Sequence, residues 1–151
     1  MTIRSANFGD MRSCASIVND WIDGTPRMPR CHDHHDVVRF YENDVFRDGR
    51  VLVAQIGTEI CGFTSLDDDG TVTALYVDES QRGCGIGKAL VDRLKRERAD
   101  GLKLWTMQAN RSAQRFYLRE GFSEVRRTDG DNEEGLPDIL YGWGPLARVS
   151  A

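Results

Sequence analysis

The part of the sequence that decides the fold is residues 75–90, which read LYVDESQRGCGIGKAL. An apolar stretch is followed by a polar turn, then by three glycines at alternate positions and an amphipathic segment. Glycine removes side chains where a ligand has to approach the main chain. The first turn of a helix leaves N–H groups unpaired at the positive end of the helix dipole. The stretch therefore predicts a strand, a phosphate-binding loop and a helix.

Composition places the chain among ordinary globular proteins. Its 151 residues fit one domain with one core, over residues 1–151. No apolar run approaches the roughly 20 residues that span a bilayer, and the N-terminus lacks the apolar core of a signal peptide. The net charge of −4 argues against a nucleic-acid binder. We expect a cytoplasmic protein that binds neither a membrane nor nucleic acid.

The spacing of cysteines and histidines does not indicate a metal site. Cys14, Cys31, Cys61 and Cys84 show no paired spacing, so we expect free thiols. All three histidines fall within residues 32–35, next to acidic residues, and ligand type alone would allow a metal there. Their spacing matches no standard zinc pattern, and no metal is predicted.

Hydrophobic periodicity predicts the other elements. Apolar residues recur at helical spacing over residues 8–23 and again around residues 37–48. The glycine-led segment carries its apolar residues on one helix face. A short helix is expected from residue 110 or 111 to about residue 119. The predicted strands are residues 2–7, 51–54, 59–66, 71–77, 102–107, 122–128 and 138–143.

These elements give the order βααβββαβαββ. The strand before the glycine loop reaches the strand at 102–107 through a helix, and such a crossover makes the two strands parallel. We predict an α/β fold with a mixed, mostly antiparallel central sheet in one layer and helices on both faces. Exposed edge strands make a homodimer possible.

Spacing within the glycine loop excludes two common phosphate-binding patterns. The Walker pattern needs four residues between its glycines, but three separate Gly83 from Gly87. The dinucleotide pattern needs two residues where one separates Gly85 from Gly87. The pattern that fits is Arg-x-x-Gly-x-Gly, beginning at Arg82. A plain helix start is the alternative, but glycines cost about 0.5–1 kcal/mol each relative to alanine within an element.

Through this pattern the chain resembles the GNAT superfamily of N-acetyltransferases. Residues 110–122, NRSAQRFYLREGF, are similar to the family's Asn-x-x-Ala-x-x-Phe-Tyr-x-x-x-Gly-Phe segment. Residues 26–30 and 132–138 resemble the corresponding segments of a bacterial subgroup of this family. The resemblance does not identify the amine acceptor. The resemblance implies a GNAT-like fold and direct transfer of an acetyl group from acetyl-CoA, the co-substrate, to an amine.

The resemblance also implies where acetyl-CoA binds. The pyrophosphate would lie on the amides of the glycine loop, and splayed strands would free main-chain groups for the pantetheine. Asn110 is expected to contact acetyl-CoA, although capping the short helix alone would explain it. The residues expected to bind acetyl-CoA are Leu75, Tyr76, Val77, Arg82, Gly83, Cys84, Gly85, Ile86, Gly87, Lys88, Asn110 and Tyr117.

Two residues are candidates for catalysis. A main-chain N–H near Val77 would polarise the thioester carbonyl, unless this strand only completes the sheet. Tyr117 resembles the family tyrosine that faces the CoA sulfur and would protonate the leaving thiolate; it also fits an apolar helix face. The strand before the loop contains no carboxylate. The general base would then be a water relay through Thr73 or an acid from another loop.

Two polar loops, residues 25–35 and 128–138, are candidates for the acceptor site, since both segments border that site in the family. The second loop holds five carboxylates, and a negative rim concentrates a protonated amine. Solvated loops are the alternative. We predict a small cationic amine acceptor; a non-catalytic acyl-CoA sensor and a protein or peptide N-acetyltransferase are the alternatives. The residues expected to contact the acceptor are His32, Thr73, Glu133 and Glu134.

Overall fold

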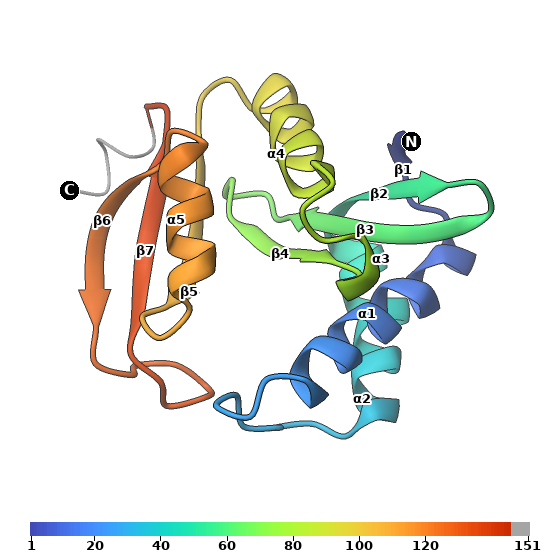
Figure 1. The fold of residues 1–151 in the computed structure, drawn as a ribbon, viewed down its shortest axis with the longest axis horizontal. Helices are drawn as coiled ribbons and strands as arrows, with labels where there is room; N and C mark the ends of the chain where they lie inside the picture. Colours follow the sequence, from blue (N-terminus) through green and yellow to red (C-terminus); the bar gives the residue numbers. More distant parts are fainter. Residues whose placement is uncertain (146–151) are drawn as a thin grey trace.

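The computed structural model describes residues 1–145 and has the predicted mixed α/β class (Figure 1). Apart from the second helical segment, the helices and strands lie within about two residues of their predicted positions. The elements are β1 (Thr2–Ser5), η1 (Phe8–Asp10), α1 (Met11–Asp23), α2 (His34–Arg39), η2 (Phe40–Val45), α3 (Phe46–Asp48), β2 (Arg50–Ile56), β3 (Glu59–Leu66), β4 (Val72–Val77), η3 (Glu79–Gln81), α4 (Ile86–Glu97), β5 (Leu102–Met107), α5 (Arg111–Arg119), β6 (Ser123–Thr128) and β7 (Asp138–Trp143).

The strands form two sheets, so the expectation of one continuous layer is wrong. One sheet has the order β1-β2-β3-β4 and the other β5-β7-β6, and all pairings within them are antiparallel. The sheets meet through a parallel bridge between Thr71 and Lys103, and β4 and β5 then diverge (Figure 1). Thr73 is an extra residue opposite the Ser65–Leu66 step, and such a bulge bends and twists its strand. Periodicity predicts strands but not this bend.

Helices cover both faces of the first sheet. On β2, Val51 and Val53 pack against α1 and α2, whereas Leu52 and Ala54 face α4. This alternation is the period-two pattern of a strand buried on both sides. Helix α5 packs on the second sheet, and its Tyr117 joins the core that includes α4. No helix in the described part of the chain is long and apolar enough to cross a membrane.

The second helical segment differs from its predicted form. It begins at His34, after Asp33, whose carboxylate accepts the Asp36 N–H at 2.7 Å. It then changes to a π-helix over Phe40–Val45, which alters the residues that share a face. Tyr41 is buried, whereas Phe40 is 51% exposed. A pattern that assumes 3.6 residues per turn cannot predict this change.

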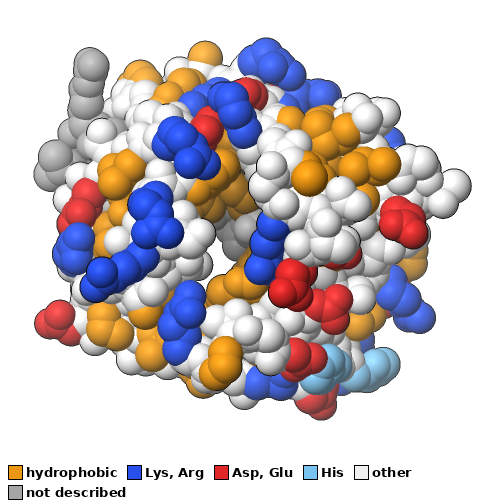
Figure 2. All heavy atoms as spheres, in the orientation of Figure 1, with side chains coloured by type: hydrophobic (Ala, Val, Ile, Leu, Met, Phe, Trp, Pro, Cys, Tyr) orange, Lys and Arg blue, Asp and Glu red, His pale blue; other side chains and the backbone are white. Residues whose placement is uncertain are grey.

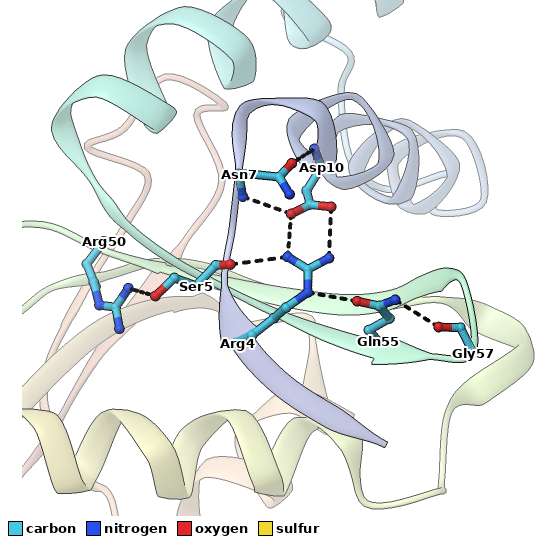
Figure 3. A network of polar contacts seen from close by, with 7 residues as sticks. All are labelled: Arg4, Ser5, Asn7, Asp10, Arg50, Gln55 and Gly57. Atoms are coloured by element: carbon cyan, nitrogen blue, oxygen red, sulfur yellow. Dashed lines mark hydrogen bonds and ion pairs between the residues drawn. The ribbon is translucent and has the colours of Figure 1, made fainter.

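A polar network holds the start of α1 against the first sheet (Figure 3). The Arg4 guanidinium donates to both oxygens of Asp10, at 2.7 and 3.1 Å, and to Gln55 Oε1 at 2.7 Å. Asp10 also accepts the Asn7 N–H at 2.8 Å, and Asn7 Oδ1 accepts the Asp10 N–H in return. Arg4, followed by the Asn7 N–H, lowers the pKa of Asp10. The network fixes the direction of α1, whose other end borders the candidate site.

Candidate functional site

The glycine loop forms an open cradle at the start of α4. Gly83 and Gly85 have φ angles of +80° and +83°, a region that other residues avoid. A Cβ added at either position would meet no protein atom within 4 Å. The N–H of Ala89 donates to Gly85 O at 3.1 Å, so the N–H groups of residues 86–88 have no acceptor within the helix. These groups can receive an anion.

The other residues of this loop have different surroundings. A Cβ on Gly87 would lie 3.4 Å from the Phe116 ring, so this glycine lets α4 pack closely on α5. The Lys88 ammonium lies 3.2 Å from a carboxylate oxygen of both Asp92 and Glu120. Arg82 and Cys84 are exposed. The side-chain charge available to a ligand at this loop is therefore that of Arg82.

The end of β4 presents main-chain groups to the space between the sheets. The Asp78 N–H donates to Cys61 O of β3 at 2.8 Å. Because main-chain groups alternate in direction along a strand, the N–H groups of Leu75 and Val77 point away from β3, on the side from which β5 has diverged. Tyr76 faces α1, with its ring 5.5 Å from that of Trp21.

Tyr117 lies at the edge of the core. Its residue is 8% exposed, and its ring contacts Phe116, Phe122 and Tyr141. Its hydroxyl forms no hydrogen bond with residues 1–145. Every fully buried side-chain oxygen or nitrogen in that range has a hydrogen-bond partner, so this hydroxyl is not fully buried. The hydroxyl must therefore reach an opening. Burial, followed by the nearby Tyr76, raises the pKa of Tyr117, which keeps the phenol protonated at neutral pH.

An acidic groove of about 590 Å³ lies between α1 and the segment that follows β4. Its apolar lining consists of Ile17, Trp21 and Val77. Figure 2 shows acidic side chains gathered over α1, beside the hollow at the centre of the molecule. A groove of this charge attracts cations. The charged residues that line it are Asp20, Asp23, Asp78, Glu79 and Arg82.

The two predicted acceptor loops meet (Figure 1). His32 Nε2 lies 2.5 Å from Glu133 Oε1, although 101 positions separate the residues. The neighbouring Glu134 is half-buried. Burial, followed by the charge of Glu134, raises the pKa of Tyr76 to about 12.

With this geometry established, comparison with known proteins identifies the family. The model described as "Acetyltransferase (GNAT) domain" matches residues 47–124, more than half of the chain. The chain belongs to the GNAT acetyltransferase family. No curated protein matches the sequence.

Solved structures share the GNAT fold at low sequence identity. The apo form of YjaB from Escherichia coli is 21% identical, with a TM-score of 0.75 over 94% of this chain and 96% of the other. YncA from Salmonella typhimurium, solved with acetyl-CoA, is 21% identical, with a TM-score of 0.76 over 96% and 94%. A ribosomal-protein-alanine N-acetyltransferase from Brucella melitensis is 21% identical, with a TM-score of 0.76 over 94% and 98%. At this identity the likeness concerns the fold alone.

The structure brings together most, but not all, of the residues expected from the GNAT resemblance. Thr73 lies at the bulge, with its hydroxyl 2.5 Å from that of Ser65 and about 13 Å along β4 from Val77. Asn110 caps α5, accepting the Ala113 N–H at 3.2 Å. Within residues 1–145 no cluster of His, Cys, Asp and Glu could hold a metal ion.

No pattern in the sequence indicates the acidic groove. Asp20 and Trp21 belong to an amphipathic helix, and the Asp78–Ser80 turn has the composition of a solvated loop. Only the packing of α1 beside the end of β4 makes them one surface. The spacing of Asp20 and Asp23 on one helix face was the only available signal.

Proposed function

We propose that this GNAT protein transfers the acetyl group of acetyl-CoA to the primary amine of a small cationic acceptor. The observation that carries the proposal is that the acidic groove reaches Val77. Val77 also carries one of the N–H groups that face the gap between the sheets. A surface that attracts a protonated amine is therefore continuous with the main chain expected to hold the thioester.

The residues of the glycine loop fit the pyrophosphate of acetyl-CoA. The space above Gly83 and Gly85 is open, and the unpaired N–H groups at the start of α4 point to a site for negative charge. Arg82 adds a positive side chain on the same loop, and Asn110 stands at the start of α5. The remaining expected contacts, from Leu75 to Val77, would hold the pantetheine through the main chain.

The chain's own groups would serve two steps of a direct transfer. In that reaction the amine gives a proton to water, and its nitrogen bonds to the acetyl carbon while the carbon–sulfur bond breaks. The Val77 N–H would hold the carbonyl oxygen; removal of one such donor costs about 2.7–4 kcal/mol of transition-state stabilisation in known enzymes. The Tyr117 phenol, protonated at neutral pH, would give its proton to the sulfur.

The meeting of His32 with Glu133 supports a small acceptor. Two loops in contact leave less room beside the cleft than two separate loops would, which disfavours a folded protein substrate. The carboxylates of the groove favour a positive charge on the acceptor. We expect the reaction to take place in the cytoplasm, since four free cysteines suit a reducing compartment. A homodimer stays a prediction.

The test is a thiol-release assay with acetyl-CoA and a panel of polyamines, aminoglycosides, amino-acid esters and peptides. We expect CoA release that depends on an amine and is fastest with small amines of more than one positive charge. Release with peptides alone would identify a peptide N-acetyltransferase. Tight binding of acetyl-CoA without transfer to any amine would support a sensor and contradict the proposal.

A further inference from the structure

Glu120, which follows the last residue of α5, carries a buried carboxylate. Its side chain is 5% exposed, and one of its oxygens lies 3.2 Å from the Lys88 ammonium of α4. Removal of a carboxylate from water is unfavourable unless a cation and hydrogen bonds compensate for it. Among residues 1–145, Lys88 is the cation that forms an ion pair with Glu120. The pair therefore links the end of α5 to the first turn of α4.

A second lysine of α4 contacts the same residue. The Lys95 ammonium donates to the main-chain oxygen of Glu120, and it lies 5.2 Å from the centre of the Trp143 ring in a cation–π contact. Lys88 and Lys95 are seven positions apart, which places them on one face of α4 about two turns from each other. Because the two contacts lie at different levels of α4, they oppose both sliding and tilting of this helix against α5.

The linked end of α4 is the end that can receive an anion. The N–H of Lys88 is one of the groups without an acceptor within the helix, so its main chain faces the expected pyrophosphate while its side chain is tied to α5. One residue earlier, a Cβ on Gly87 would lie 3.4 Å from the Phe116 ring, so the two helices are already in close contact at this level. A shift of these N–H groups relative to α5 would have to break the pair between Lys88 and Glu120.

The same carboxylate lies one helical turn from the proposed proton donor. Tyr117 precedes Glu120 by three positions, which places both residues on one side of α5. The Phe122 N–H donates to Tyr117 O at 3.0 Å and closes the end of the helix. One acetyl-CoA molecule has to reach both the start of α4 and the Tyr117 hydroxyl. The spacing between these groups therefore has to be held within narrow limits for transfer to occur.

We propose that Glu120 is a positioning residue, which through Lys88 holds the anion-binding start of α4 at the distance from Tyr117 that acetyl-CoA requires. The Lys88 ammonium is then a link between two helices and not a ligand of the pyrophosphate. The part played by Tyr117 rests on the proposed N-acetyltransferase function. The link between α4 and α5 follows from the contacts alone.

Two substitutions break the link from opposite sides. Glu120→Gln keeps the size of the side chain and removes its charge. Lys88→Met removes the ammonium, and because the Lys88 side chain is 61% exposed, this variant should fold even if Glu120→Gln does not. Asp92→Asn is the matched control, since Asp92 pairs with Lys88 within α4 and leaves the contact with α5 in place. A thermal melt of each variant shows whether it is folded at the assay temperature.

Calorimetric titration with CoA tests the link without any turnover. Glu120→Gln and Lys88→Met should each raise Kd for CoA at least fivefold. The double variant should bind no more than twofold more weakly than the weaker single variant, because all three lack the same contact. Asp92→Asn should bind within twofold of wild type. Tighter binding by Glu120→Gln would mean that Glu120 competes with the pyrophosphate for Lys88, and this result, an unchanged Kd in both single variants or additive effects would each overturn the proposal.

Turnover at saturating acetyl-CoA, with the amine that reacts fastest in the thiol-release assay, tests the connection to Tyr117. Glu120→Gln should lower kcat at least tenfold in wild type and less than twofold in Tyr117→Phe, because the spacing no longer matters once the hydroxyl is absent. A purely structural role would lower kcat equally in both backgrounds and would overturn the positioning role. If no amine is acetylated, the proposed N-acetyltransferase function and the part played by Tyr117 are both contradicted. The CoA titration alone then decides whether Glu120 and Lys88 hold the anion site.

Discussion

Substitution of Gly85 by alanine distinguishes the role of this glycine in folding from its role in binding acetyl-CoA. Gly85 has a φ angle of +83°, and its added Cβ would project into open space. An alanine in this conformation costs about 1–2 kcal/mol. Alanine also reduces the conformational freedom of the unfolded chain, which offsets about 0.4–1 kcal/mol of this cost. We expect a net destabilisation of about 1 kcal/mol, or a fall in Tm of about 2–4 °C for a chain of this size.

The same methyl group should have a larger effect on acetyl-CoA. It would add a side chain to the loop that leads into the unpaired N–H groups of residues 86–88, where we expect a phosphate to bind. Loss of one charge-assisted hydrogen bond costs about 1.5–3 kcal/mol. Because each 1.4 kcal/mol is tenfold in affinity, Kd for acetyl-CoA should rise about ten- to hundredfold. Calorimetric titration measures this change, and a thermal melt measures the stability.

Gly57, in the β2–β3 turn, is the matched control for this experiment. It has a φ angle of +61°, and its added Cβ also meets no atom within 4 Å. Gly57→Ala should lower Tm by a similar amount and leave Kd for acetyl-CoA unchanged. If Gly85→Ala binds acetyl-CoA as tightly as Gly57→Ala does, the glycine loop is not the pyrophosphate site.

Three further predictions concern Tyr117, the exposed cysteines and Asp10. Tyr117→Phe should lower kcat about a hundredfold with little change in Kd for acetyl-CoA; an unchanged kcat in the thiol-release assay would remove Tyr117 from the chemistry. A maleimide should react first with the exposed Cys31 and Cys84, and bound acetyl-CoA should protect only Cys84, as peptide mass spectrometry would show; Cys14 is buried, with its pKa raised to about 12. Because Arg4 lowers the pKa of Asp10, the charged Asp10 carboxylate stabilises the fold above about pH 4, the ordinary pKa of an aspartate, and this stabilisation is lost as the pH falls through the lowered pKa. Urea unfolding of Asp10→Asn should therefore depend less on pH in this range. An unchanged acid dependence would argue against the ion pair.

The element order could be predicted from the sequence because most elements are amphipathic and end at clear turn signals. The run at 59–66 and the run at 138–143 became β3 and β7 with the predicted bounds. Periodicity did not predict the division into two sheets, which the resemblance implied only as splayed strands, because the division depends on a bulge at Thr73 and on how far β5 follows β4. The π-helix was missed because it breaks the 3.6-residue period on which the prediction relies.

The candidate site was predicted unevenly for a physical reason. Gly83 and Gly85 could be recognised in the sequence because a left-handed backbone at the start of a helix strongly favours glycine. The acidic groove and the contact between His32 and Glu133 join segments far apart in the chain, and no local pattern encodes such proximity. Asn132 and Asp138 are ordinary loop residues by composition, and only the structure shows that the Asn132 amide donates to the Asp138 carboxylate.

The most direct test of the account is to identify the product formed from acetyl-CoA and the amine panel. We expect mass spectrometry to find one acetyl group on a primary amine of a small cation, with an equal amount of CoA released and far less of both with Gly85→Ala. CoA release without an acetylated amine, or acetyl-CoA binding without release, would contradict the assignment of this chain as a small-amine N-acetyltransferase.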